Sequence, residues 1–128
     1  MAGTIIVSTI SDGTNSTSST NCIRGSAKAW VNFAGSATPT INSSYNISSI
    51  TYNSTGLFTL NFTTAMPNAS YAAFGSCSTS GTCGTVIYDG AYTNTTSTFQ
   101  FATGAVANFS GSLTLGNYSK TYVAVFSN

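Results

Sequence analysis

The clearest alternation of apolar and polar positions lies in residues 49–75, SITYNSTGLFTLNFTTAMPNASYAAFG. Phe58, Leu60 and Phe62 alternate with small polar residues, so they are expected on one face of a β-strand. A turn signal ending at Gly56 precedes this strand. Pro67 ends it, because proline cannot donate a hydrogen bond to a β-ladder. The stretch therefore predicts a strand, a tight turn, a strand, a proline turn and a further strand.

The same pattern extends toward the N-terminus. Residues 4–10, TIIVSTI, predict a strand, and residues 11–21 predict a polar linker with a turn at Asp12-Gly13. In residues 22–33, small and apolar side chains occupy one face of a predicted strand, and Trp30 lies on the other face. This arrangement predicts either a strand covered on both faces, with Trp30 in the core, or an exposed Trp30 that contacts a partner.

Short strands are also predicted in the second half of the chain. Residues 76–84 predict a loop of small residues, and residues 120–127 predict a last strand that is apolar on both faces, as in a central or interface-covered strand. No helix is predicted. The regular spacing of about eight to ten short strands indicates an all-β protein, an antiparallel β-sandwich. Residues 22–128 would form the sandwich domain, and residues 1–21 an anchoring or inter-subunit strand and linker.

The low charge of the chain limits its partners. Only 4% of residues are charged, and the net charge is +1, whereas about a quarter of residues are charged in ordinary soluble domains. Ser, Thr and Asn fill over two fifths of the positions. This composition argues against nucleic acid and anionic membranes as partners, and no apolar segment is long enough to span a membrane. Low charge also removes the repulsion that keeps β-edges apart, so we expect edges to pair with copies of the same chain.

Acid–base catalysis has few candidate groups. The chain contains no histidine and no glutamate, and its two acids, Asp12 and Asp89, each precede a glycine in a turn signal. General acid–base catalysis needs groups that titrate near the working pH, and glycoside hydrolysis needs two carboxyl groups beside the scissile bond. The residues therefore predict a protein that is not an enzyme and that holds no cofactor or metal.

Four segments, taken in order, resemble a module of tail-fibre and related virion proteins of tailed bacteriophages, particularly marine and cyanobacterial ones. They are GSAKAWVNF (25–33), SYNISSIT (44–51), FTLNFTTAMP (58–67) and NASYA (68–72), and the resemblance covers residues 23–75. It implies a phage virion structural protein of the tail-fibre class, assembled in the bacterial host cytoplasm and located in the tail or on the particle surface. Together with the uncharged, two-sided apolar strands, it suggests a homotrimer that attaches to other virion proteins through its N-terminal segment. Its loops would be presented to a bacterial surface polysaccharide.

An alternative function is a capsid decoration or tail-surface structural protein without a receptor role, because these 128 residues contain no shaft. For the receptor role, aromatic residues in polar loops would stack on sugar faces, and neighbouring polar side chains would bind hydroxyl groups. The same tyrosines are also typical of residues that cover a sheet face or a subunit seam. The candidate glycan contacts are Tyr88, Asp89, Tyr92, Asn94, Asn117 and Tyr118, with Tyr52 as a further candidate.

The three cysteines allow two interpretations. Cys77 and Cys83 lie six positions apart, so a hairpin between them would bring their sulfur atoms into range for a disulfide, leaving Cys22 unpaired. Alternatively, all three are free thiols, because a phage protein assembles in a reducing cytoplasm. Metal binding is disfavoured by the cysteine spacing and by the absence of histidine.

Overall fold

Strands dominate the structure, a computed structural model that describes residues 3–87, 93–106 and 113–127. Within these residues, nine strands form one antiparallel sheet in the order β4-β3-β11-β7-β8-β9-β6-β5, and β10 pairs with β9. The predicted all-β antiparallel fold is therefore confirmed. The strands of this sheet are β3 (Ala29–Ala34), β4 (Thr40–Tyr45), β5 (Ile47–Ser54), β6 (Leu57–Phe62), β7 (Ala72–Thr79), β8 (Thr82–Ile87), β9 (Thr98–Val106), β10 (Leu113–Leu115) and β11 (Lys120–Phe126).

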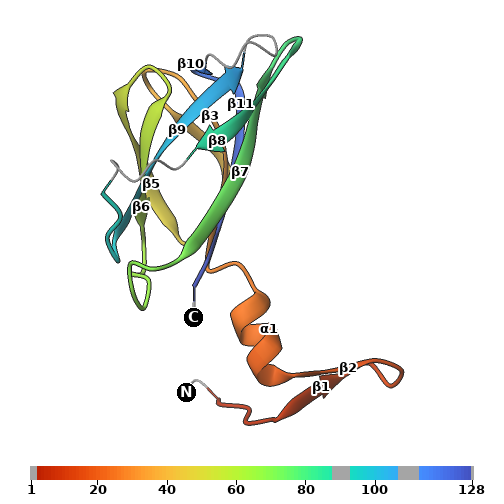
Figure 1. Ribbon diagram of the computed structural model, residues 1–128. Helices are drawn as coiled ribbons and strands as arrows, with labels where there is room; N and C mark the ends of the chain where they lie inside the picture. Colours follow the sequence, from red (N-terminus) through yellow and green to blue (C-terminus); the bar gives the residue numbers. More distant parts are fainter. Residues whose placement is uncertain (1–2, 88–92, 107–112, 128) are drawn as a thin grey trace.

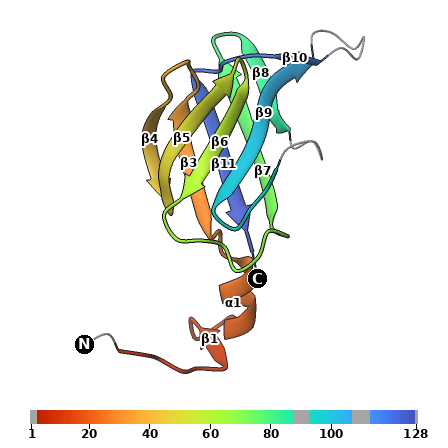
Figure 2. The ribbon, with the colours of Figure 1, turned by 90° about the vertical axis from the view of Figure 1, so that its left-hand side faces the viewer.

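The sheet folds back on itself into a nearly barrel-shaped sandwich (Figures 1 and 2). One layer contains β4, β3, β11 and β7, the other contains β9, β6 and β5, and β8 joins the two layers by pairing with both β7 and β9. As predicted from its two apolar faces, β11 is a central strand, paired with β3 on one side and β7 on the other.

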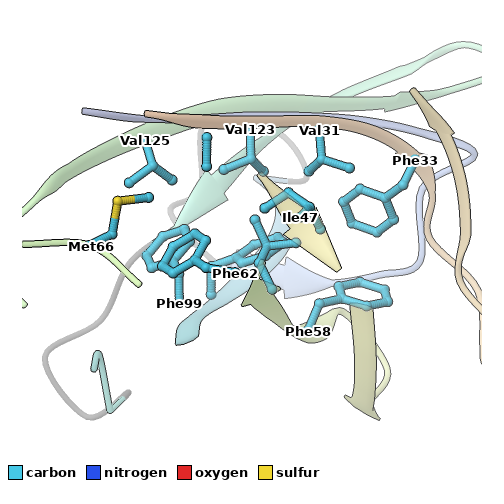
Figure 3. Packing of buried hydrophobic residues seen from close by; sticks show 12 residues of the cluster. Val31, Phe33, Ile47, Phe58, Phe62, Met66, Phe99, Val123 and Val125 are labelled. Atoms are coloured by element: carbon cyan, nitrogen blue, oxygen red, sulfur yellow. The ribbon is translucent and has the colours of Figure 1, made fainter. Parts of the chain in front are cut away.

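The core lies between the layers and follows the alternation of the sequence. Val31, Val123 and Val125 point from one layer toward Phe62 and Phe99 in the other (Figure 3). Aromatic rings meet edge to face at the centre, where the Phe33 and Phe58 ring centroids are 5.3 Å apart. The buried hydrophobic cluster consists of Ala29, Val31, Phe33, Ile47, Phe58, Leu60, Phe62, Met66, Phe99, Phe101, Val123 and Val125.

Asn46 connects the two layers, because it is the one residue between the end of β4 and the start of β5. Its backbone has a positive φ of 58°, a conformation that asparagine tolerates better than most residues. The side chain donates from Nδ2 to the carbonyl oxygens of Lys28 and Thr64, and its Oδ1 accepts from the Thr64 amide. These bonds fix the crossover to the residue directly before β3 on one side and to the segment after β6 on the other.

An N-terminal arm lies beyond the end of the sandwich that carries the last strand's C-terminus (Figures 1 and 2). It consists of residues 3–8, the hairpin β1 (Thr9–Ser11) and β2 (Ser16–Ser18), and the helix α1 (Ser19–Gly25). The predicted turn is present, since the Asp12 carboxylate accepts hydrogen bonds from the Thr14 and Asn15 amides.

The helix was not predicted, and the absence of helix is the main error of the sequence-based fold. α1 begins after Ser18, whose hydroxyl oxygen accepts a hydrogen bond from the Asn21 amide and so caps the first turn. It buries no side chain, so no amphipathic pattern marks it in the sequence. The arm therefore continues to Gly25, past the expected end of the linker at residue 21.

Two predicted segments also differ in extent. Residues 76–84 were expected to be a loop, but they form most of the β7–β8 hairpin, which turns at Gly81 with a φ of 76°. The strand expected over residues 4–10 is limited to β1, since the described residues before Thr9 pair with no strand of their own chain.

Candidate binding surfaces

The predicted glycan-contact residues do not form a common site in the described part of the chain. Asn117 serves the fold, because its Oδ1 accepts a hydrogen bond from the Gly56 amide at the β5–β6 turn. Tyr118 is 6% exposed, and this burial raises the pKa of its hydroxyl. Its ring is therefore not available for stacking on a sugar. Tyr88, Asp89 and Tyr92 lie outside the described residues.

The other two candidates also face inward. Asn94 is half-buried, and its Oδ1 lies in the interior without a hydrogen-bond partner among the described residues. Tyr52 packs edge to face on the buried ring of Phe58, with centroids 5.8 Å apart. The structure therefore gives neither residue the exposed ring or amide that a glycan contact needs.

Cys77 and Cys83 are free thiols, which agrees with the second of the two interpretations of the cysteines, and the possible disulfide between them is not formed. The register of the hairpin explains this: Cys77 pairs with Gly84, whereas Cys83 pairs with Ser78. The two side chains therefore point to opposite faces, with Cys77 buried and Cys83 exposed. Burial raises the pKa of the Cys77 thiol.

Acid–base or metal chemistry has no centre among the described residues. Asp12 lies in the exposed turn of the arm, where hydrogen bonds from the Asn15 and Thr14 amides lower the pKa of its carboxyl group. In the described ranges no group of three His, Cys, Asp or Glu side chains comes together to hold a metal ion. Nor does any helix of these ranges have the length and hydropathy required to cross a membrane.

A row of large apolar side chains covers the outer face of the β4-β3-β11-β7 layer; we call it the aromatic face. Cross-strand pairing places Phe74, Ala124, Trp30 and Tyr45 side by side on four consecutive strands. The three aromatic rings of this row are exposed to solvent, with Trp30 at 40% and Phe74 at 62%. Tyr122 and Phe126 belong to the same face, because they alternate with the inward-pointing valines of β11.

An open groove of about 650 Å³ runs over this face. Trp30 and Phe74 are among its lining residues, with Ala124 between them in the row and Tyr122 two residues from Ala124 along β11. Hydroxyl and amide groups supply the polar part of the lining. The complete lining is Trp30, Val31, Asn32, Ser43, Phe74, Gly75, Ser76, Tyr122, Val123 and Ala124.

The outer face of the opposite layer is polar. There the cross-strand rows are Thr51, Thr59 and Gln100, and next to them Ser49, Asn61 and Thr98. These side chains bond to one another: the Asn61 amide nitrogen, for example, donates to the hydroxyl groups of Ser49 and Thr51. One layer thus follows the usual alternation with polar side chains outward, whereas the other departs from it along four adjacent strands.

A second exposed apolar surface lies on the N-terminal arm. Ile5 and Ile6 are 88% and 92% exposed, and Val7, Ile10 and Ile23 are also exposed. An isolated exposed aliphatic residue is common, but a segment with several in succession is typical of a contact surface. These side chains are aliphatic, whereas the large exposed side chains of the groove, Trp30, Phe74 and Tyr122, are aromatic.

The sequence contained a signal for the aromatic face that pattern alone could not resolve. Large side chains occupy both faces of β3 and β11, so the face of each strand that points away from the core must be apolar instead of polar. The structure shows that Ala29, Val31 and Phe33 form the core side. Trp30 is therefore the exposed residue, which was the second of the two interpretations.

Comparisons with protein-family models, with curated proteins and with solved structures found no match to this chain. No match therefore links it to tail-fibre proteins, and that resemblance stays a prediction.

Proposed function

We propose that this protein is a virion structural protein of the phage tail-fibre class. In this proposal the N-terminal arm joins three copies of the chain and connects them to other virion proteins. The β-sandwich is held outward and attaches to a bacterial surface polysaccharide. The resemblance over residues 23–75 supplies the class, and the two separate apolar surfaces support a module that both assembles and attaches.

The observation that carries the assembly step is the exposure of the arm. Full burial of an isoleucine side chain stabilises a protein by roughly 1.5–3 kcal/mol, and Ile5 and Ile6 are almost fully exposed in the single chain. Neither residue belongs to a strand that pairs within its own chain. Contact with the arms of other copies would bury these side chains and give the unpaired backbone a partner.

Native mass measured by light scattering tests the assembly step. We expect a trimer for the wild-type chain and a monomer for the double variant Ile5→Ser/Ile6→Ser. Leu115→Ser is the matched control, because it makes the same kind of change at an exposed aliphatic residue outside the arm. A monomeric wild-type chain, or a trimer unaffected by the double variant, contradicts assembly through the arm.

Retention of the assembled protein on envelope polysaccharides from a panel of bacteria tests the attachment step. The competing function is a capsid decoration or tail-surface protein without a receptor role. One observation favours it: Asn117 and Tyr118, two of the candidate glycan contacts, stabilise the fold through a hydrogen bond and through burial, and are not presented on a binding loop. If the trimer forms but no polysaccharide fraction retains it, attachment is refuted and the decoration function takes its place.

A further inference from the structure

We propose that the groove on the aromatic face binds an uncharged polysaccharide, whose pyranose rings stack on Trp30, Phe74 and Tyr122. The inference rests on the attachment function proposed above and assigns it a site. That site lies on the flat of the sheet and not on the loops where sequence analysis placed it.

In the row of cross-strand neighbours, two large aromatic residues flank one small residue, and this difference in size forms the groove. Phe74 and Trp30 both pair with Ala124, one from β7 and the other from β3. Adjacent strands lie about 4.8 Å apart, so these two aromatic residues are separated by about 10 Å. Only the methyl group of Ala124 lies between them in the row. The groove is open along its surface, which suits a polymer laid across the sheet better than an enclosed small molecule.

Polar groups beside the rings match the hydroxyl groups of a sugar. The next row across the sheet consists of Ser76, Tyr122, Asn32 and Ser43. The Asn42 amide nitrogen donates to Asn32 Oδ1 over 3.3 Å, which orients the Asn32 amide at the edge of the groove. Each amide has hydrogen-bonding atoms beyond those used in this bond. A few oriented polar groups around an apolar surface are typical of ligand sites.

Charge indicates which class of polysaccharide fits. None of the residues that line the groove is charged. Lys120 of β11 and Lys28, which comes directly before β3, are both outside this lining. Lys28 Nζ donates to the Ile23 carbonyl and to the Ser26 hydroxyl. A neutral glycan has no charge to desolvate in such a groove, whereas an acidic one would enter it without a counter-charge.

The kind of exposed apolar side chain differs between this surface and the N-terminal arm. Large outward side chains on the face are aromatic, and the exposed isoleucines are on the arm. Aromatic rings offer a flat, electron-rich face to the C–H groups of a sugar ring, and branched aliphatic side chains do not. Contacts between protein chains use both kinds of side chain. The uncharged polar groups beside the rings of the groove favour sugar there, and the exposed aliphatic side chains favour assembly through the arm.

Trp30 is the chain's only tryptophan, so its fluorescence reports on the groove directly. The test titrates the full-length protein with neutral and acidic fractions of bacterial envelope polysaccharide, and with dextran and galactomannan as defined neutral polymers. We expect a neutral polymer to shift the Trp30 emission to shorter wavelength and to reduce its quenching by acrylamide. Acidic fractions should leave the emission unchanged.

Variants then locate the binding. Phe74→Ala and Tyr122→Ala should each weaken binding at least about tenfold, a loss of about 1.4 kcal/mol, with Trp30 still present as the reporter. Trp30→Ala should abolish binding measured by calorimetry, and Trp30→Phe should restore part of it because a ring remains. Thr59→Ala and Gln100→Ala on the opposite outer face are the controls and should bind normally. Thermal unfolding of each variant identifies any loss that comes from misfolding.

The outcomes separate this inference from the function on which it rests. Binding of a neutral polymer that the groove variants leave unchanged overturns the groove site but keeps the attachment function. Binding of acidic fractions alone also overturns the inference. Retention by no polysaccharide refutes both proposals. If Trp30→Ala and Phe74→Ala convert the assembled protein into monomers, the face is a contact between copies and the sugar site is refuted.

Discussion

Asn46 lies where the chain passes from one layer of the sandwich to the other, and replacing it isolates the contribution of this crossover to stability. Asn46→Ala removes two hydrogen bonds of 3.1 Å from Nδ2 and one of 2.7 Å to Oδ1. It also places alanine at a φ of 58°. The variant leaves the hydrophobic core unchanged, because Asn46 is not part of it.

The magnitude follows from these contacts. Each hydrogen bond contributes roughly 0.5–1.5 kcal/mol net, and the site is only partly buried, so water replaces some of what is lost. We take about 2 kcal/mol for the three bonds together. Alanine with a positive φ adds about 1 kcal/mol. The expected decrease in the free energy of unfolding is therefore about 3 kcal/mol, a large part of the stability of a small domain.

Urea unfolding followed by circular dichroism measures this change, with the slope of the transition checked for constancy. Asn46→Gly should be less destabilising than Asn46→Ala by roughly 1 kcal/mol, because glycine adopts a positive φ without strain. Asn42→Ala, which removes one long bond on an exposed edge, should change stability by less than about 0.5 kcal/mol. A loss below about 0.5 kcal/mol for Asn46→Ala would refute the role assigned to the crossover.

Three further predictions concern single groups. Phe58→Ala should destabilise the protein by about 3–5 kcal/mol, because its fully buried ring packs on those of Phe33 and Phe101; a loss below about 1 kcal/mol in the same urea assay would contradict this packing. Cys83 should react rapidly with a thiol reagent in the folded protein and Cys77 only after unfolding, since Cys77 is buried and its pKa is raised; equal rates would contradict the register. The Asp12 carboxyl should titrate below its ordinary pKa of 3.8, as measured by NMR. Because the pKa of Asp12 is lower in the folded protein than in the unfolded chain, the carboxylate stabilises the arm turn at any pH above its unfolded-state pKa. This stabilisation is lost as the pH falls through the folded-state pKa. A measured pKa at or above 3.8 would show that the turn hydrogen bonds are not formed in solution.

The sequence predicted the parts of the fold in which alternation coincides with large apolar side chains. Phe58, Leu60 and Phe62 lie on the core side of β6 as their spacing indicated. β11, which is apolar on both faces, is central because it pairs with β3 on one side and β7 on the other, while its outer face stays exposed. Whether such a side chain faces the core depends on its burial, and the local alternation of apolar and polar residues reflects that burial directly.

Other strands exist because of their neighbours. β4, with the sequence TINSSY, has mostly small polar side chains, and it is a strand because it pairs with β3. The β7–β8 hairpin is rich in Ser, Thr, Cys and Gly, and close approach of chains explains one of its glycines: a Cβ at Gly84 would lie 2.6 Å from the Gly104 carbonyl oxygen. Such tertiary requirements leave no periodic signal in the sequence.

The candidate site was harder to predict for the same reason. Pattern shows that Trp30 and Val31 are on opposite faces of β3, but only the assembled sandwich shows which of the two faces the core. The pattern of tyrosines in polar loops pointed to Tyr118, which is buried. Phe74 and Tyr122 were not predicted as contact residues, although both are exposed.

The central claim is that the arm assembles the protein while the aromatic face stays free for sugar. Acrylamide quenching of Trp30 in the assembled wild-type protein, before and after addition of a neutral polysaccharide, tests it most directly. We expect Trp30 in the assembly to be as accessible to acrylamide as in the monomeric Ile5→Ser/Ile6→Ser variant, and we expect polysaccharide to protect it. A Trp30 that is already protected in the assembly without polysaccharide would contradict this division of roles, because the face would then be covered by another copy of the chain.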